Sequence, residues 1–322
     1  MLLDITHVTQ YNYDEPVRES VMELWMQPRA AHGQNLLNFN LDVDPLAQVF
    51  SYVDCWGNTV RHFDVPHPHT RLTITTHSLV ETDARPPLPG AVDASEWERL
   101  GSDFVQDECW EFLRPHGFAA STPRLQAFCE AHGVAELRRL DPLTALDRLS
   151  TVLYRGLDYE RGVTGADSPI DEALEAGRGV CQDFAHIMIT IARGWGIPAR
   201  YVSGYLAASR AQGERSDPQA THAWVEVFLP SLRWVGFDPT NDILACDRHI
   251  PVAIGRDYSD VPPSRGVFKG DAESQLSVGV SVRNADSGEP AYLRLGAPAI
   301  AAARRRASSA ARLDQHHQQQ QQ

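Results

Sequence analysis

Hydrophobic and polar residues alternate along the first part of the chain. Alternation with a period of two recurs at 38–43, 59–65 and 71–80, with turn residues between these runs. Gly57-Asn58 predicts a hairpin turn between 48–53 and 59–65. We therefore expect an N-terminal β-rich domain over residues 1–90, ending in a stiff linker at 85–90 that contains three prolines, Pro86, Pro87 and Pro89.

The pattern becomes helical after residue 95. Apolar residues recur at intervals of three and four at 125–129 and 143–153, which is typical of amphipathic helices. A short helix is predicted to start at Ser168-Pro169 and to stop near Gly177. A second helix begins at Cys181 or just before it, buries one apolar stripe and ends before Gly196.

Three β-rich runs follow, at 200–206, 222–229 and 233–237, and the last two predict a hairpin that turns at 230–232. Another alternating run, at 275–283, predicts a last strand that closes this second domain. Helices beside antiparallel strands give an α+β fold. We expect a catalytic domain over 91–295 with its core motifs at 155–245, followed by a disordered tail at 296–322 that is too poor in apolar residues to form a core.

Charge and composition narrow the function classes. The formal net charge of −13 over 322 residues disfavours binding to a nucleic-acid backbone. No run of about 20 apolar residues predicts a membrane span, and the first residues lack a basic leader with an apolar segment, so we expect a cytoplasmic protein. Its 5 cysteines form no Cys-x-x-Cys pair, which indicates reduced thiols and neither a zinc site nor a disulfide framework.

Cys181 is the candidate nucleophile. A helix N-terminus lowers a thiol pKa, because its free N–H groups and its dipole stabilise the thiolate. The flexible segment 177–180 lets the backbone approach a substrate, and the N–H of Cys181 is a ready donor to an oxyanion. The alternative is an inert cysteine in a helical core.

The predicted hairpin supplies a base and a carboxylate. With a turn at 230–232, His222 lies opposite Asp238 or one diagonal step from it, and both side chains project from the same face of the sheet. The helix that begins at Cys181 must then pack on this face for the thiol to meet the histidine. This spacing predicts a triad in which Asp238 orients His222 as general base for Cys181.

Three ordered motifs carry a resemblance. GRGVCQDFAHIMITIARGWGIPARYVSGYL, then THAWVEV, then RWVGFDPTN resemble the core of bacterial transglutaminase-like proteins, over roughly residues 155 to 245. The opening HVTQYNYDEPVRESVMELWMQPR looks like the β domain that often precedes that core. The resemblance implies a papain-like fold, with the cysteine on a helix and the histidine and aspartate on adjacent strands.

The implied chemistry is thiol-dependent acyl transfer on amide bonds of a peptide or protein substrate. We expect a cysteine peptidase or amidase, because cross-linking is not the general expectation for the bacterial members and no calcium-loop pattern is present. A protein-glutamine transglutaminase with an amine acceptor would use the same residues. A non-catalytic binding scaffold is the third alternative. No cofactor and no metal are expected, and the sequence does not predict the oligomeric state.

Other residues near the motifs are weaker candidates. Gln182 and Asp183 occupy the first helical turn, where an acidic or polar residue is favoured whatever the function. Tyr159 precedes the nucleophile, where members of the resembled family place a side chain that donates to the oxyanion. Trp224 alternates onto the His222 face, where it either walls a substrate groove or is simply buried.

The tail yields the first prediction. Deleting residues 300–322 should leave the melting temperature and the activity almost unchanged, because this segment has too little apolar surface to offset its ordering entropy. Thermal unfolding of the full and shortened chains is the measurement. A fall of several degrees in the shortened chain would contradict the prediction.

Overall fold

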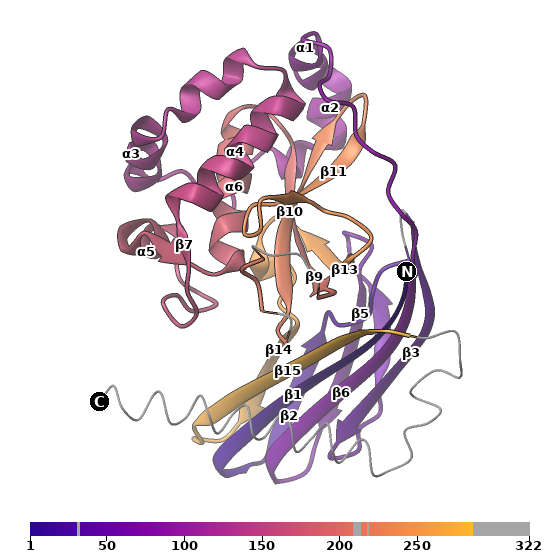
Figure 1. Ribbon diagram of the computed structural model, residues 1–322. Helices are drawn as coiled ribbons and strands as arrows, with labels where there is room; N and C mark the ends of the chain where they lie inside the picture. Colours follow the sequence, from indigo (N-terminus) through magenta and orange to yellow (C-terminus); the bar gives the residue numbers. More distant parts are fainter. Residues whose placement is uncertain (31–32, 209–213, 218, 286–322) are drawn as a thin grey trace.

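The computed structural model describes residues 1–30, 33–208, 214–217 and 219–285, and its fold is α+β. Figure 1 shows a β-rich N-terminal domain at one end and a core of helices around a second sheet at the other. The predicted fold class is therefore correct. Residues 286–295, at the end of the predicted catalytic domain, and the predicted tail at 296–322 lie outside the described residues.

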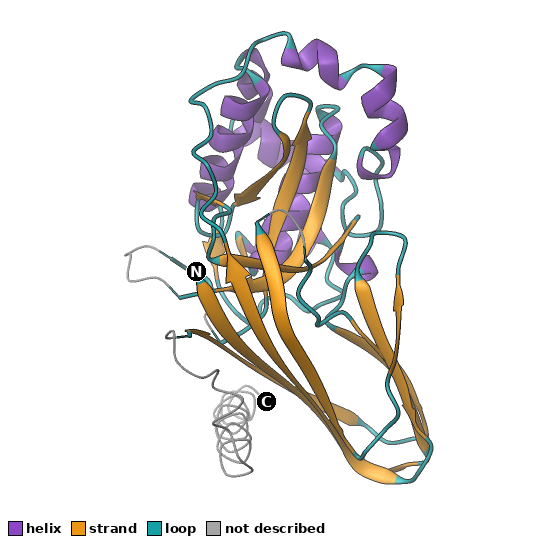
Figure 2. Ribbon diagram, turned by 90° about the vertical axis from the view of Figure 1, so that its right-hand side faces the viewer, coloured by secondary structure: helices purple, strands orange, loops and turns teal. Residues whose placement is uncertain are grey.

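Two four-stranded sheets form the β-rich domain and lie face to face (Figure 2). Their strands are β1 (Leu2–Val17), β2 (Glu19–Leu24), β3 (Gln34–Asp44), β4 (Phe50–Val53), β5 (Thr59–Val65), β6 (His69–Thr82), β14 (Ser264–Lys269) and β15 (Ser274–Asn284). The strand orders are β15-β1-β6-β3 and β14-β2-β5-β4. Alternate residues such as Leu24, Phe63 and Leu72 fill the space between the sheets, so the period-two pattern buries one face of each strand.

The last two strands differ from the sequence expectation. β15 is present where alternation predicted it, but it pairs antiparallel with β1, with Val280 opposite His7, and does not close the catalytic domain. β14 likewise pairs with β2. The pattern of a strand identifies its buried face but not its partner, and the 16-residue β1 offers a long edge for pairing. The chain thus returns to the β-rich domain after forming the core.

The linker leads into a helical region that covers one side of the core. Its elements are α1 (Glu96–Leu100), α2 (Asp103–Glu108), η1 (Trp110–Phe112), α3 (Pro123–Ala131), η2 (Val134–Arg139) and α4 (Pro142–Gly156). Side chains cap the two longest of these helices, because Thr122 accepts the N–H of Leu125 and Asp141 accepts the N–H of Thr144. Among the described residues, no helix combines the length and the hydropathy needed to cross a bilayer.

A five-stranded antiparallel sheet and one buried helix form the centre of the core. The elements are β7 (Asp158–Tyr159), α5 (Ile170–Ala176), β8 (Arg178–Gly179), α6 (Cys181–Gly194), β9 (Ala199–Leu206), β10 (His222–Leu229), β11 (Arg233–Asp238), β12 (Ile243–Leu244), β13 (His249–Gly255) and η3 (Tyr258–Asp260). The sheet order is β12-β11-β10-β9-β13. α6 packs its apolar residues, among them Phe184 and Met188, into the same core cluster as Val225 of β10.

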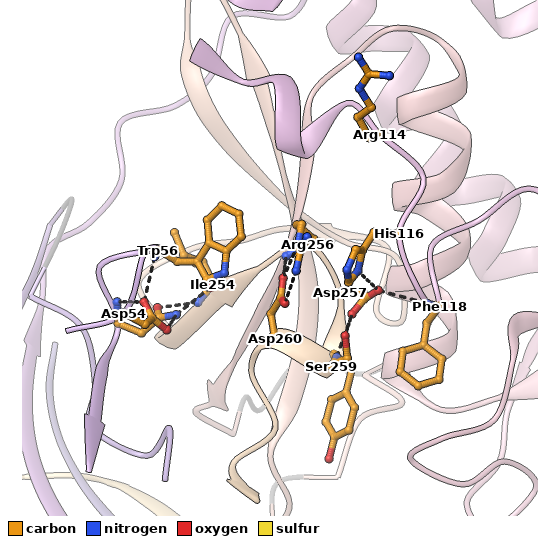
Figure 3. A network of polar contacts seen from close by, with 12 residues as sticks. Asp54, Trp56, Arg114, His116, Phe118, Ile254, Arg256, Asp257, Ser259 and Asp260 are labelled. Atoms are coloured by element: carbon orange, nitrogen blue, oxygen red, sulfur yellow. Dashed lines mark hydrogen bonds and ion pairs between the residues drawn. The ribbon is translucent and has the colours of Figure 1, made fainter. Parts of the chain in front are cut away.

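Buried polar contacts join the two domains. Asn58, just before β5, accepts the Ile254 N–H at 2.9 Å and donates to the Ile254 carbonyl at 2.8 Å, so an N-terminal side chain pairs with the edge of β13. Asp54 holds that turn by accepting the Trp56 N–H at 2.9 Å (Figure 3). On the core side of this region, the Asp257 carboxylate accepts from His116 Nδ1 at 2.8 Å (Figure 3). These contacts fix the position of β13 from both sides.

Gly204 in β9 gives a prediction about stability. A Cβ built on Gly204 would lie 2.7 Å from Trp224 Cη2 and closer still to the Ile250 carbonyl oxygen. Gly204→Ala should therefore lower the unfolding free energy by about 1–3 kcal/mol, as overpacking of a filled core does. Urea denaturation is the measurement. Gly90→Ala, where a Cβ meets nothing within 4 Å, is the control, and equal midpoints for the two variants would contradict the packing.

Candidate active site

Cys181 is the first residue of α6, and a buried carboxylate holds this helix start in place. Asp183 accepts the Val180 N–H at 2.8 Å and the Thr164 hydroxyl at 2.6 Å, so it caps the helix and ties it to the preceding loop. Gly179 makes room for that cap, because a Cβ there would lie 2.6 Å from Asp183 Oδ2. The thiol is therefore carried on a fixed helix end.

His222 and Asp238 lie at the adjacent ends of two neighbouring strands. β10 starts at His222, β11 ends at Asp238, and Val225 pairs with Phe237 in the register between them. Continuing this register puts Trp224 opposite Asp238 and His222 one diagonal step away. His222 Nε2 meets Asp238 Oδ2 at 2.7 Å, and both side chains are buried. The structure brings together the pair that the hairpin spacing selected.

Charge on both sides sets the protonation of His222. Burial lowers the pKa of His222, but the Asp238 carboxylate and the Cys181 thiol outweigh that effect and raise it to about 10. A doubly protonated ring donates from Nε2 to Asp238 and leaves Nδ1 for the thiol. Nδ1 is buried and makes no hydrogen bond of ordinary geometry within the described part of the chain. Contacts of this kind are often loose before substrate binds.

The helix packs on the face of the sheet opposite to the one expected. Val225 and Phe237, a facing pair, belong to the core cluster under α6. His222 and Asp238 alternate onto the other face, so the expectation that α6 covers the His222 face is wrong. The thiol can still influence His222 because each is the first residue of its element, and the two meet at the end of the strand.

Asp238 binds more donors than the predicted triad includes. Its Oδ2 accepts from His222, from Asn241 Nδ2 at 2.7 Å and from His249 Nε2 at 3.2 Å. Its Oδ1 accepts the backbone N–H groups of Thr240 at 3.1 Å and Asn241 at 3.3 Å. Burial raises the pKa of this carboxyl, but the two histidines hold it well below the usual range. Asp238 is therefore an anion at every ordinary pH.

Sequence reasoning missed both Asn241 and His249. Asn241 could have been found, because an Asp-Pro-Thr-Asn run favours turns in which the side chains bond to nearby backbone. Its Oδ1 also accepts the N–H of Arg215 at 2.8 Å and so joins the loop before β10 to the site. No local signal marks His249, which reaches Asp238 only through the pairing of β13 with β9.

Two family models match the chain. Residues 3–81 match the model described as the bacterial transglutaminase-like N-terminal region, and residues 134–239 match that of the transglutaminase-like superfamily. An uncharacterized protein of Mycobacterium leprae is 35% identical over 279 residues, covering 86% of this chain and 97% of that protein. The chain belongs to the bacterial transglutaminase-like family. Membership supports thiol-dependent catalysis without specifying the reaction.

A solved structure and a second relative add to this comparison. A solved structure described as "a Putative Cysteine Protease from Cytophaga hutchinsonii" superimposes with a TM-score of 0.68 at 20% identity, covering 89% of this chain and 92% of that one. A protein-glutamine gamma-glutamyltransferase of Pseudomonas aeruginosa is 35% identical over 89 residues, but these are 25% of this chain and 12% of that protein. The first likeness shows the two-domain fold, and the second is confined to a short segment.

Tyr159 and Gln182, two of the weaker site candidates, differ in what they contact. Tyr159 lies beside Gly179 in the parallel pair β7–β8, and burial together with the Cys181 charge raises its pKa, so it is a neighbour of the thiol. Gln182 donates to the Ala166 carbonyl at 2.9 Å, and that contact ties down a loop. Nothing in this contact directs Gln182 toward a substrate.

Trp224 is not a groove wall. Its side chain is wholly buried, it stacks on the His222 ring at 6.1 Å between centroids, and it packs with Val202 and Ile254. The alternation placed Trp224 correctly on the His222 face of the sheet, but this face is buried at Trp224. The interpretation of Trp224 as a groove wall is therefore wrong. Its buried ring packs against the His222 imidazole and supports it.

The site contains one cluster with the donor types of a metal centre. Within the described ranges, one possible ligand atom each from His222, Asp238 and His249 lies within 4.8 Å of the others. All three residues are buried, and hydrogen bonds at 2.7 and 3.2 Å already join them. These hydrogen bonds account for the cluster without an ion.

The His222–Asp238 pair makes a prediction about titration. Because the folded pKa of His222, about 10, lies above the ordinary 6.5, this histidine contributes stability that is fully present below pH 6.5 and is lost as pH rises through about 10. Asp238→Asn should lower the His222 midpoint by roughly 2 units or more, since the neutral amide no longer favours imidazolium. Imidazole NMR titration of the two proteins measures this. An unchanged midpoint would contradict the assigned contact.

Proposed function

We propose that the protein is a cysteine peptidase or amidase that hydrolyses amide bonds of a peptide or protein substrate through a thioester on Cys181. The observation that supports this most is the His222 ring, held by Asp238 at 2.7 Å through Nε2, with Nδ1 left for a thiol at a helix start. A nucleophile, a proton carrier and an orienting carboxylate are together the parts of a thiol acyl-transfer site.

The reaction has two halves. The Cys181 thiolate attacks the amide carbonyl, and the free N–H at the start of α6 stabilises the oxyanion. The C–N bond then breaks as His222 gives its Nδ1 proton to the departing amine, which leaves a thioester. His222 next removes a proton from water, the hydroxide adds to the thioester carbonyl, and the C–S bond breaks to release the acid. The thiolate and the imidazolium are restored.

The high pKa of His222 defines its role in the first half. With a pKa of about 10, the ring holds a second proton at neutral pH and faces the thiol as a cation before substrate binds. His222 therefore acts first as the acid for the leaving group and as a base only toward water. In the proposed reaction Tyr159, whose pKa burial and the Cys181 charge raise, donates to the oxyanion together with the backbone N–H.

Three of the other four thiols lie in less reactive settings. Burial raises the pKa of Cys109 and Cys129, and burial with nearby acidic groups raises that of Cys55. A raised pKa leaves less thiolate at neutral pH, and the thiolate is the nucleophilic form. Cys246 differs, because its hydrogen bond with His249 outweighs the effect of burial and lowers its pKa. What distinguishes Cys181 is its position at a helix start and its interaction with the His222 ring, and on these two observations it is the nucleophile of the proposal.

Transamidation is the second candidate, because the glutamyltransferase relative shares a segment with this chain. The same thioester would then be attacked by a primary amine in place of water. A glutamine-containing peptide incubated with a fluorescent primary amine separates the two. Conversion of the glutamine to a peptide-bound glutamate with release of ammonia and little incorporated amine supports hydrolysis, and amine incorporation that exceeds glutamate formation overturns it in favour of transfer.

Replacing the nucleophile tests the shared chemistry. Cys181→Ser should lower kcat by on the order of 10³-fold or more with little change in melting temperature, because the hydroxyl is similar in size but far less acidic. Cys55→Ser, at an exposed thiol, is the matched control and should keep full activity. Fluorogenic peptide amides followed by rate and by mass spectrometry provide the assay. Retained turnover in Cys181→Ser would refute the nucleophile assignment.

A further inference from the structure

A second histidine shares the carboxylate of the triad. His249 is the first residue of β13, its side chain is fully buried, and its Nε2 lies 3.2 Å from Asp238 Oδ2, the oxygen that His222 contacts. The family comparison and the sequence motifs give this residue no role. A buried histidine whose ring nitrogen meets the same oxygen as the proton carrier calls for a physical explanation.

The surroundings of His249 determine its tautomer. The backbone N–H of Cys246 donates to His249 Nδ1 at 3.1 Å, and the Cys246 thiol faces the same nitrogen at 3.7 Å. A nitrogen that accepts a hydrogen bond carries no proton. The remaining ring proton is then on Nε2, where it is donated to Asp238. His249 is thus a neutral donor, whereas His222 on the other side of the carboxylate is a cation.

Packing prevents His249 from turning away. Its ring meets the edge of the Trp224 ring at 5.2 Å between centroids and an interplanar angle of 75°. β13 itself is held against β9 by pairing and against the N-terminal domain by Asn58, which hydrogen-bonds both backbone groups of Ile254. The hydrogen bond to Asp238 therefore comes from a part of the core that both domains fix.

This arrangement has two consequences for the proton carrier. A donor on Oδ2 limits rotation of the carboxylate and keeps this oxygen on His222 Nε2. The same N–H also offsets part of the negative charge that stabilises the His222 imidazolium. An imidazolium stabilised too strongly is a poor acid toward the leaving amine, so some compensation of this charge favours turnover.

We propose that His249 is a positioning residue, a neutral Nε2–H donor that fixes the Asp238 carboxylate and limits the basicity of His222. This inference rests on the proposed acyl-transfer function. It adds a fourth side chain to the predicted set, which acts on the reaction only through Asp238 and His222. It also assigns a function to the contact between β13 and the end of β11.

Two substitutions at His249 distinguish the effect of the Nε2–H donor from the effect of the size of the ring. His249→Phe keeps an aromatic ring of similar size and removes the N–H, whereas His249→Gln places an amide N–H near the former Nε2. For His249→Phe we expect kcat to fall on the order of 10-fold with KM changed less than about 2-fold, because the contact is to the catalytic carboxylate and not to substrate. His249→Gln should recover most of the kcat.

The pH dependence distinguishes positioning from a merely structural role. Removing the donor leaves more negative charge at His222, so its pKa should rise and the basic limb of kcat/KM should move up by roughly half a unit in His249→Phe. A structural role would lower the amount of folded enzyme and leave this limb in place. His69→Phe is the matched control, because His69 is a buried histidine of the β-rich domain with both ring nitrogens bonded. It should leave the limb unmoved.

The NMR midpoint of His222 in the same variants needs no substrate and keeps the two proposals separable. A wild-type protein that turns over no amide, with a His222 midpoint that still rises in His249→Phe, would refute the proposed function and support the positioning role. A folded His249→Phe protein with wild-type kcat, basic limb and midpoint would overturn the positioning role. A His249→Gln protein with a kcat as low as that of His249→Phe would also overturn the positioning role, because restoring an N–H donor would then not restore turnover.

Discussion

The buried carboxylate of Asp238 is the constraint on which the active site depends. A charge with no exposed surface is stable only if hydrogen bonds replace the water it has lost, and this one receives five. The donors come from β10, from the turn after β11 and from β13, so three separate segments must be in place at once. Their convergence fixes His222 at the end of its strand, where the start of α6 brings the thiol.

The two domains are coupled through the strand that carries His249. β13 lies at the edge of the central sheet, and backbone groups on its outer side pair with the β-rich domain. Ile254 bonds to the Asn58 side chain, and the Pro251 carbonyl accepts from the Arg29 N–H and the Gln34 side chain. The chain then returns to that domain through β14 and β15. The N-terminal domain therefore does more than precede the core in sequence, because it supports the strand behind the orienting carboxylate.

Much of this site could be predicted from local sequence. The start of α6 follows from Gly179 and Cys181 ahead of an apolar stripe, and the parity of positions about the turn at 230–232 gave the His222–Asp238 contact. What could not be predicted depends on long-range packing. Neither the face on which α6 lies, nor the pairing of β15 with β1, nor the approach of His249 is encoded within one element.

In the proposed reaction the Cys181 sulfur carries the acyl group of a covalent intermediate, and trapping that intermediate is the most direct test. The wild-type protein is mixed with an activated peptide ester, quenched in acid within the first turnover and digested for mass spectrometry. We expect an acyl adduct on the peptide that contains Cys181 and a much smaller yield in His222→Ala. Ester turnover with the acyl group on another residue, or with no adduct at any time point, would contradict it.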